Sequence, residues 1–160
     1  MFLSTMTNNL DAKGRVSVPA DFRAEASLSA FDGVILWPGF SGPYLEGGGL
    51  ALVQSYQRSL ELMDPYDPAR LALEDAIFAE SFKLPFDGTG RVSLPKGLTE
   101  YAGLNGKVMF VGRGQNFQIW NPQIRQTHKE DVRRLARENM HLLRSVPSGH
   151  GSSGTSGGAL

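Results

Sequence analysis

Two short stretches of this sequence carry residues suited to holding an anionic partner. Asp11–Pro19 reads DAKGRVSVP and Asp87–Pro95 reads DGTGRVSLP, so positions 1, 4, 5, 6, 7 and 9 of the stretch are identical in two copies that lie 76 residues apart. A guanidinium presents several N–H donors in one plane and can bind a negatively charged group through two hydrogen bonds. The repetition predicts a duplicated module that presents Arg15 and Arg91 in the same way.

Each arginine directly follows a four-residue turn that begins with Asp and ends with Gly. An Asp side chain can accept hydrogen bonds from the backbone of its own turn, and Gly tolerates a positive φ. We therefore expect the four residues at these positions to shape the turns and to orient the arginines, and not to bind a ligand themselves. These four residues are Asp11, Gly14, Asp87 and Gly90.

The elements that must position the arginines are short strands. Residues 1–10 and 15–18 are expected to form a hairpin, and alternation along the second strand places Arg15 and Ser17 opposite Val16 and Val18. Residues 82–86 and 91–94 repeat this pattern. In each copy a proline then begins a short helix, over 19–28 and 95–104, because proline lacks only an N–H that has no helical partner there.

Apolar strands follow the short helices. They are predicted at 34–37 and 108–111, with a further strand at 117–120 that corresponds to Tyr44–Leu45, and a glycine-rich loop is predicted from Gly39 to Gly49. Between the copies, helical spacing of apolar residues over 50–63 and around 71–78 predicts two connecting helices, the second capped by Asp67. The parts are then 1–50 and 81–124 as modules, 51–80 as helical connector, 125–146 as C-terminal helix and 147–160 as disordered Gly/Ser tail.

Each copy of about 45 residues is too small to bury a large core alone, so we expect the copies to pack face to face. The predicted fold class is α+β, a duplicated swapped-hairpin β-barrel with pseudo-twofold symmetry. Its buried face is predicted to contain Val16, Val18, Phe22, Val92, Leu94 and Leu98. We also place Trp37 and Trp120 in the core or at a subunit contact.

Composition argues against a disulfide-bonded protein, a membrane-spanning protein and one that coats nucleic acid through its bulk charge. The chain has 160 residues, 41% of them hydrophobic, no cysteine and a formal net charge of zero. Disulfides are therefore absent, a reducing cytoplasm is the simplest location, and no window approaches the ~18 apolar residues of a membrane span. Basic against acidic residues number 3 to 5 in 1–50, 2 to 6 in 51–80, 5 to 2 in 81–120 and 6 to 3 in 121–160. An anionic partner must therefore meet a local patch.

An enzyme is a weak alternative. His128, His141 and His150 all lie near the C-terminus, without a nucleophile and carboxylate arranged around them, and the sequence has neither an H-E-x-x-H motif nor a Walker-type loop. We expect no catalytic residue, no metal, no cofactor and no small-molecule substrate.

The doubled D-x-x-G-R-[hydrophobic]-S-[hydrophobic]-P pattern, the helical connector, the later segment GRGQNFQIW and a C-terminal helix resemble the MraZ family, which is built from two SpoVT/AbrB-type modules. The resemblance covers roughly residues 1–145. It implies a bacterial transcriptional regulator, generally a repressor, of the division and cell-wall gene cluster. It also implies binding to short direct repeats in its own promoter, a nucleoid-associated cytoplasmic location and subunits that close into a ring.

The resemblance implies double-stranded DNA as the partner, and the family's Asp-x-x-x-Arg elements fall on Asp11 with Arg15 and on Asp87 with Arg91. Because an arginine on an antiparallel ribbon can bind guanine or grip phosphate, we assign Arg15 and Arg91 to DNA, together with Lys13 at the tip of the first turn. The counterpart of Lys13 is Thr89, so the two turns are not expected to contribute equally. Lys96 is a further candidate for a phosphate contact. The alternative left open is an AbrB-fold protein-interaction or antitoxin-like assembly module without direct DNA readout.

Overall fold

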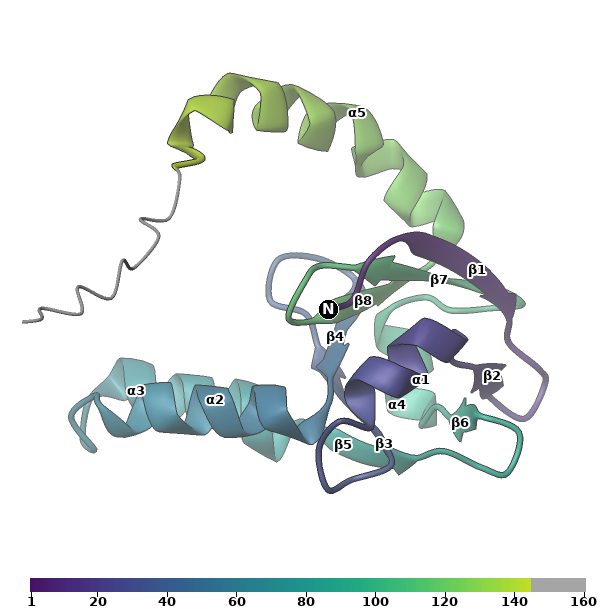
Figure 1. Cartoon of the computed structure of the whole chain (residues 1–160), viewed down its shortest axis with the longest axis horizontal. Coiled ribbons are helices and arrows are strands. Elements are labelled where there is room, and N and C mark those ends of the chain that lie inside the picture. The colour runs from purple at the N-terminus through teal and green to yellow at the C-terminus, as the bar shows by residue number, and fades with distance from the viewer. Residues whose placement is uncertain (145–160) are drawn as a thin grey trace, which may run out of the picture. The chain divides into compact units, whose positions relative to one another are not determined.

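The computed structural model describes residues 1–144, and its main feature is a six-stranded antiparallel sheet (Figure 1). The strands of this sheet follow the order β1-β7-β8-β4-β3-β5, and every neighbouring pair is antiparallel. Their bounds are β1 Thr5–Asn9, β3 Gly33–Pro38, β4 Tyr44–Gly48, β5 Phe82–Pro85, β7 Lys107–Gly112 and β8 Phe117–Trp120. With five α-helices among the described residues, the fold is of the α+β class, as predicted.

The order of the strands is symmetric with respect to the sequence repeat. Strands β1, β3 and β4 of the first copy correspond to β5, β7 and β8 of the second. Exchanging each strand for its counterpart reverses the order and reproduces it. Strand β1 pairs with β7, and β5 pairs with β3, so the first strand of each copy completes the sheet of the other.

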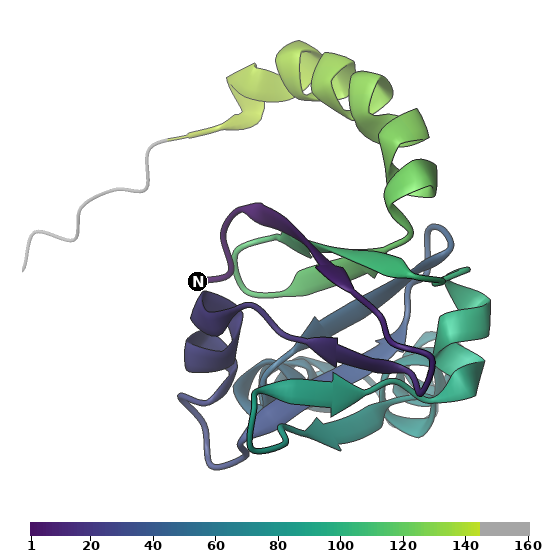
Figure 2. The same ribbon diagram turned by 90° about the vertical axis from the view of Figure 1, so that its right-hand side faces the viewer.

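The remaining two strands, β2 (Arg15–Ser17) and β6 (Arg91–Ser93), form a separate antiparallel pair, the ribbon (Figure 2). The predicted local hairpin of residues 1–10 and 15–18 is present only next to its turn, where Leu10 bridges Val16 and the N–H of Asp11 donates to the carbonyl of Arg15. Further along it is wrong, because β1 pairs with β7 and β2 with β6. Each strand finds a full-length partner in the other copy, and these partners bury the apolar residues that a lone hairpin would leave exposed.

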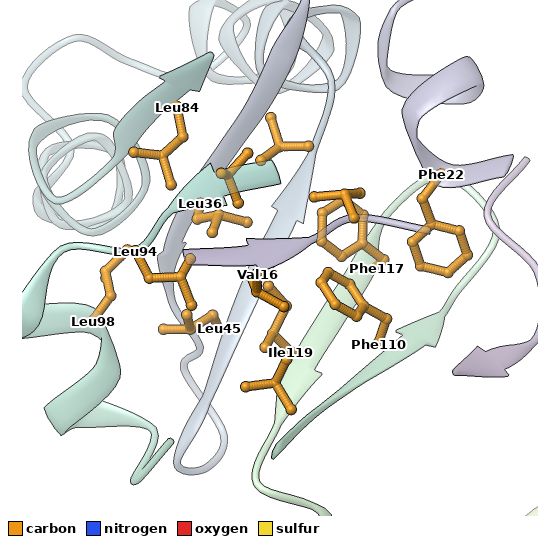
Figure 3. Packing of buried hydrophobic residues seen from close by; sticks show 14 of the residues in the cluster. Val16, Phe22, Leu36, Leu45, Leu84, Leu94, Leu98, Phe110, Phe117 and Ile119 are labelled. Atoms are coloured by element: carbon orange, nitrogen blue, oxygen red, sulfur yellow. The ribbon is translucent and has the colours of Figure 1, made fainter. Parts of the chain in front are cut away.

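One hydrophobic cluster takes residues from both copies (Figure 3). All six residues predicted for the buried face belong to it, and each is at most 6% exposed. At its centre the Phe22 ring lies edge-on to Phe110 at 6.1 Å and against Phe117 at 5.4 Å. Phe2 completes this group, with its ring 5.3 Å from that of Phe22. The core is therefore a joint product of the two copies.

The helices lie close to their predicted positions. Prolines precede α1 (Ala20–Ala26) and α4 (Lys96–Tyr101), and α2 (Leu50–Glu61) forms the first connecting helix. Asp67 caps α3 (Pro68–Glu74) by accepting a hydrogen bond from the N–H of Ala69. A single π-helical turn, Asp75–Ala79, continues α3 and was not predicted.

Tyr44 and Leu45, predicted as the counterpart of strand 117–120, do lie in a strand, but the predicted glycine-rich loop is wrong at 46–48, because β4 continues through these residues and pairs with β3 and β8. Gly47 explains why a glycine suits this strand. A Cβ atom there would lie 2.3 Å from the Leu36 side chain and 3.0 Å from the Phe117 ring, so the missing side chain permits close packing of the core.

Residues 1–127 form one compact unit, and residues 128–144 belong to a second. The last long helix, α5 (Pro122–Asn139), begins in the first unit and is followed by a 3-10 turn, Met140–Leu142. The predicted disordered tail, 147–160, lies outside the described residues, and the five-part division of the chain stays a prediction. Over the described residues, none of the helices combines the length and apolar character needed to span a membrane.

Candidate functional site

The first turn is organised by one carboxylate. Oδ1 of Asp11 accepts hydrogen bonds from the backbone N–H groups of Lys13 at 2.9 Å and Arg15 at 2.8 Å. Its Oδ2 accepts a hydrogen bond from Nε of Arg15 at 2.7 Å. A single side chain thus fixes both the turn and the direction of the arginine that follows it.

The second turn repeats this arrangement. Oδ1 of Asp87 accepts from the N–H groups of Thr89 and Arg91, both at 2.9 Å, and Oδ2 accepts from Nε of Arg91 at 2.9 Å. The Thr89 hydroxyl adds a further hydrogen bond to Oδ1, also at 2.9 Å. The side chain at the tip of this turn is thus bound to the turn itself, whereas Lys13 extends from the first turn as an exposed amine.

The glycines that end the turns also join the two copies. Gly14 and Gly90 adopt φ of +80° and +78°, a conformation that favours glycine. The carbonyl of Gly14 accepts from the N–H of Leu94 at 2.8 Å, and that of Gly90 accepts from the N–H of Val18 at 3.1 Å. Each turn is therefore attached to the end of the other copy's ribbon strand.

The ribbon presents its polar side chains on one face. Arg15 is paired with Ser93 and Arg91 with Ser17, while the central pair, Val16 and Val92, is only 1% exposed. Because paired residues point to the same side of an antiparallel ribbon, all four polar side chains point away from the core.

The two arginines keep donors for a ligand. Their side chains are 35% and 36% exposed, for Arg15 and Arg91 respectively. Each uses Nε for its aspartate, and within residues 1–144 the structure records no acceptor for the Nη1 and Nη2 groups. These donors are available to an anion or to a hydrogen-bond acceptor on a base.

The electrostatics of the turns favour ionised aspartates. Hydrogen bonds from the backbone of Arg15, followed by those from its side chain and from the backbone of Lys13, hold the pKa of Asp11 below its ordinary value of 3.8. The backbone N–H groups of Arg91 and Thr89 lower the pKa of Asp87 well below the same value. Both carboxylates are therefore charged at neutral pH and neutralise part of the guanidinium charge beside them.

Two clefts flank the turns and differ in their basic residues. A cleft of about 650 Å³ beside the first turn is lined by Lys13 and Lys96, and one of about 500 Å³ beside the second turn is lined by Arg23. Sequence reasoning missed Arg23, whose Nη1 donates to the carbonyl of Val18 and which lies against Gly90. Its place four residues after Pro19, where the second copy has Thr99, is the signal that could have drawn attention to it.

Other predicted features lie elsewhere. Trp37 and Trp120 are core residues, 2% and 5% exposed. Within residues 1–144 no three His, Asp or Glu side chains are grouped closely enough to hold a metal ion. The structure brings together Asp11 with Arg15 and Asp87 with Arg91, while Lys13 belongs to the cleft beside the first turn.

Fold and site together define a class: α+β proteins with a mostly antiparallel sheet and a separate two-stranded ribbon, on which two aspartate-oriented arginines point outward. The family model described as "MraZ protein, putative antitoxin-like" matches residues 1–38 and 77–139. The chain belongs to the MraZ family.

Named relatives support this membership. A protein named "Transcriptional regulator MraZ" from Rickettsia bellii (strain OSU 85-389) is 41% identical over 147 residues, which cover 91% of this chain and 98% of the relative. One of the same name from Caulobacter vibrioides (strain NA1000 / CB15N) is 44% identical over 145 residues, covering 91% and 92%. A third, from Rickettsia akari (strain Hartford), is 39% identical over 146 residues, covering 91% and 98%.

Proposed function

We propose that this protein is a sequence-specific regulator of transcription that binds double-stranded DNA through the ribbon. The observation that carries the proposal is the pair of arginines, Arg15 and Arg91, held by Asp11 and Asp87 on the outward face of one antiparallel pair. The names of the relatives support a regulatory role, and a DNA-binding regulator needs no catalytic residue.

The two-stranded form of the ribbon suits DNA. A two-stranded antiparallel ribbon can enter the major groove of B-DNA, where the Nη donors of an arginine can bind O6 and N7 of guanine or a backbone phosphate. Antiparallel pairing puts the two arginines toward opposite ends of the ribbon, since Arg15 faces Ser93 and Arg91 faces Ser17. We assign Arg15 and Arg91 to base or phosphate contacts and Lys13 to a phosphate contact.

The symmetric order of the strands and the exchange of β1 and β5 support our proposal that the fold is a duplicated swapped-hairpin barrel. A single ribbon with two arginines should bind DNA weakly, so we propose that several copies assemble, in a ring-like homo-oligomer, and engage successive direct repeats. The sites would lie in the protein's own promoter upstream of the division and cell-wall gene cluster, repression would be the usual outcome, and the protein would act in the cytoplasm at the nucleoid.

Fluorescence anisotropy with a duplex that carries direct repeats from the protein's own upstream region tests the proposal. Arg15→Ala and Arg91→Ala should each weaken binding by about tenfold or more, because each removes a contact worth about 1–3 kcal/mol. Binding should also fall steeply with salt, since each phosphate contact releases counterions. Arg58→Ala, which removes an exposed arginine from α2, is the matched control and should leave binding unchanged.

Unchanged affinity in both ribbon variants would refute the assignment of the arginines. If those variants also kept their regulatory effect in cells, the result would favour the protein-interaction or antitoxin-like module without direct DNA readout. Solution mass measured in the same buffer shows whether the binding unit is an assembly.

A further inference from the structure

A cavity of about 450 Å³ lies between the sheet and the connecting helices, away from the ribbon. Residues of β3 and β4 line one side of it, and residues of α2, α3 and the π-helical turn line the other. Its volume falls within the range of about 300–1,000 Å³ typical of small-molecule sites. None of the residues that line it is Lys or Arg.

Aromatic side chains make up much of the lining, namely Trp37, Phe40, Tyr44 and Tyr56. The Trp37 and Tyr56 rings meet edge to face, with centroids 6.1 Å apart, and Tyr44 stacks on Trp120 at 4.7 Å. Phe40 is 58% exposed and lies where the cavity opens. Three of the four rings are thus in contact with another aromatic ring, which limits their movement.

One carboxylate, that of Glu46, lies among these rings. Glu46 is half-buried on β4 and pairs across the strands with Trp37. Its Oε1 accepts a hydrogen bond from the Asn116 side chain. Among charged groups, Arg113 has the largest effect on the pKa of Glu46. Within residues 1–144, however, no ion pair joins the two side chains.

Burial outweighs the neighbouring positive charge at this carboxylate. Burial raises the pKa of Glu46 above its ordinary 4.5, against the smaller opposing effects of Arg113, Gln118 and Asn116. Burial and then the charge of Glu46 raise the pKa of Tyr56. A cation placed in the cavity would lower both pKa values, because it would favour the charged form of Glu46 and offset the effect of that charge on Tyr56.

We propose that this cavity binds a small organic cation, an amine or quaternary ammonium joined to an apolar group. Glu46 supplies the counter-charge, and the faces of Trp37, Tyr44 and Tyr56 attract the cation and cover the apolar group. A neutral apolar molecule would leave the carboxylate uncompensated, and an anion would be repelled by it. The site is separate from the DNA contacts and does not depend on them.

Binding of three probes of similar size to the full chain tests the proposal. The probes are phenethylamine, 2-phenylethanol and 3-phenylpropanoate. Their binding is measured by calorimetry and by tryptophan fluorescence. Phenethylamine should bind at least tenfold more tightly than the alcohol, and the carboxylate should not bind. Equal binding of the amine and the alcohol, or binding of the carboxylate, would overturn the proposal.

Variants locate the binding. Glu46→Gln should reduce phenethylamine affinity to that of the alcohol, while Glu138→Gln, which changes an exposed carboxylate on α5, should have no effect. If Glu46→Gln unfolds the chain, Ser59→Trp is the second test. Ser59 is an exposed residue at the cavity, so a Trp there should block phenethylamine and leave thermal unfolding unchanged. Unaltered amine binding in a folded variant of either kind would refute a small-molecule site.

Discussion

At the scale of single residues, Asp11 and Asp87 each serve two purposes with two oxygens. Oδ1 holds the backbone of the turn, and Oδ2 holds Nε of the arginine that follows. An Asn side chain could accept the backbone hydrogen bonds in part. In one orientation, however, its NH2 group would face the guanidinium, and both groups are donors. A carboxylate at this position therefore couples the shape of the turn to the direction of the arginine.

We expect acid to loosen both turns. The pKa values of Asp11 and Asp87 are lower in the folded state, so their stabilising effect is fully present above the ordinary value of 3.8 and is lost as pH falls through the lower folded values. The thermal unfolding midpoint of the protein should fall as pH drops below about 4. The double variant Asp11→Asn and Asp87→Asn should be less stable at neutral pH and should lose part of this dependence. An identical pH profile in the variant would contradict the assignment.

At the scale of elements, each turn requires its final glycine. Ala at Gly14 or Gly90 must adopt a left-handed conformation, which costs about 1–2 kcal/mol. The new Cβ atom would also lie 3.0 Å from the carbonyl oxygen of Leu94 or 2.7 Å from the Arg23 side chain. Both variants should lower the free energy of unfolding by at least this amount, with Gly90→Ala also displacing Arg23.

Chemical denaturation measures this loss, and Gly88 supplies the control within the same turn. An added Cβ at Gly88 meets no atom within 4 Å, and its φ is not positive. Gly88→Ala should therefore leave the free energy of unfolding within about 0.5 kcal/mol of the parent. A loss as large as that of Gly90→Ala would mean that the turn needs flexibility and not a particular conformation.

The sequence was informative about local elements and about which face is buried. The alternation around Val16 and Val92 identified the outward arginines, and Pro19 and Pro95 marked the starts of two helices. The partner of each strand could not be found this way, because alternation shows which side of a strand is buried but not which strand lies beside it.

Two features that the sequence did not predict, the full extent of β4 and the cavity beside Glu46, share a physical cause. Glycine suits two positions of β4 because side chains approach its backbone closely, Leu36 and Phe117 at Gly47 and Leu52 at Gly48. This reason appears only once those side chains are in place. The cavity beside Glu46 lies between residues of β4 and residues of α2. These residues face one another only because the chain reverses direction between the two elements. Tertiary packing, not local propensity, decides both features.

At the scale of the whole molecule, the shared core makes the two copies interdependent. Phe22 is fully buried and contacts the rings of Phe2, Phe110 and Phe117. Phe22→Ala should cost about 3–5 kcal/mol of stability. The space left by the missing Phe22 ring would weaken the core of both copies, so residues 1–127 should still unfold in a single transition. Calorimetry and near-UV circular dichroism can follow this transition together.

Leu62→Ala is the control for this prediction, since Leu62 is 90% exposed and its loss should cost less than about 0.5 kcal/mol. Two separate transitions in the Phe22→Ala variant, one for each copy, would show that the copies have independent cores.

Because Val16 pairs with Val92, the ribbon cannot form until the ribosome has synthesised both strands. The ribosome adds about 5–20 residues per second, so the 76 residues between these valines take about 4–15 s to appear. Throughout that time the first ribbon strand has no partner, and Val16 and Val18 have no core to enter. The nascent first half is therefore a substrate for chaperones that bind apolar strands, and slower translation would lengthen its exposure to aggregation.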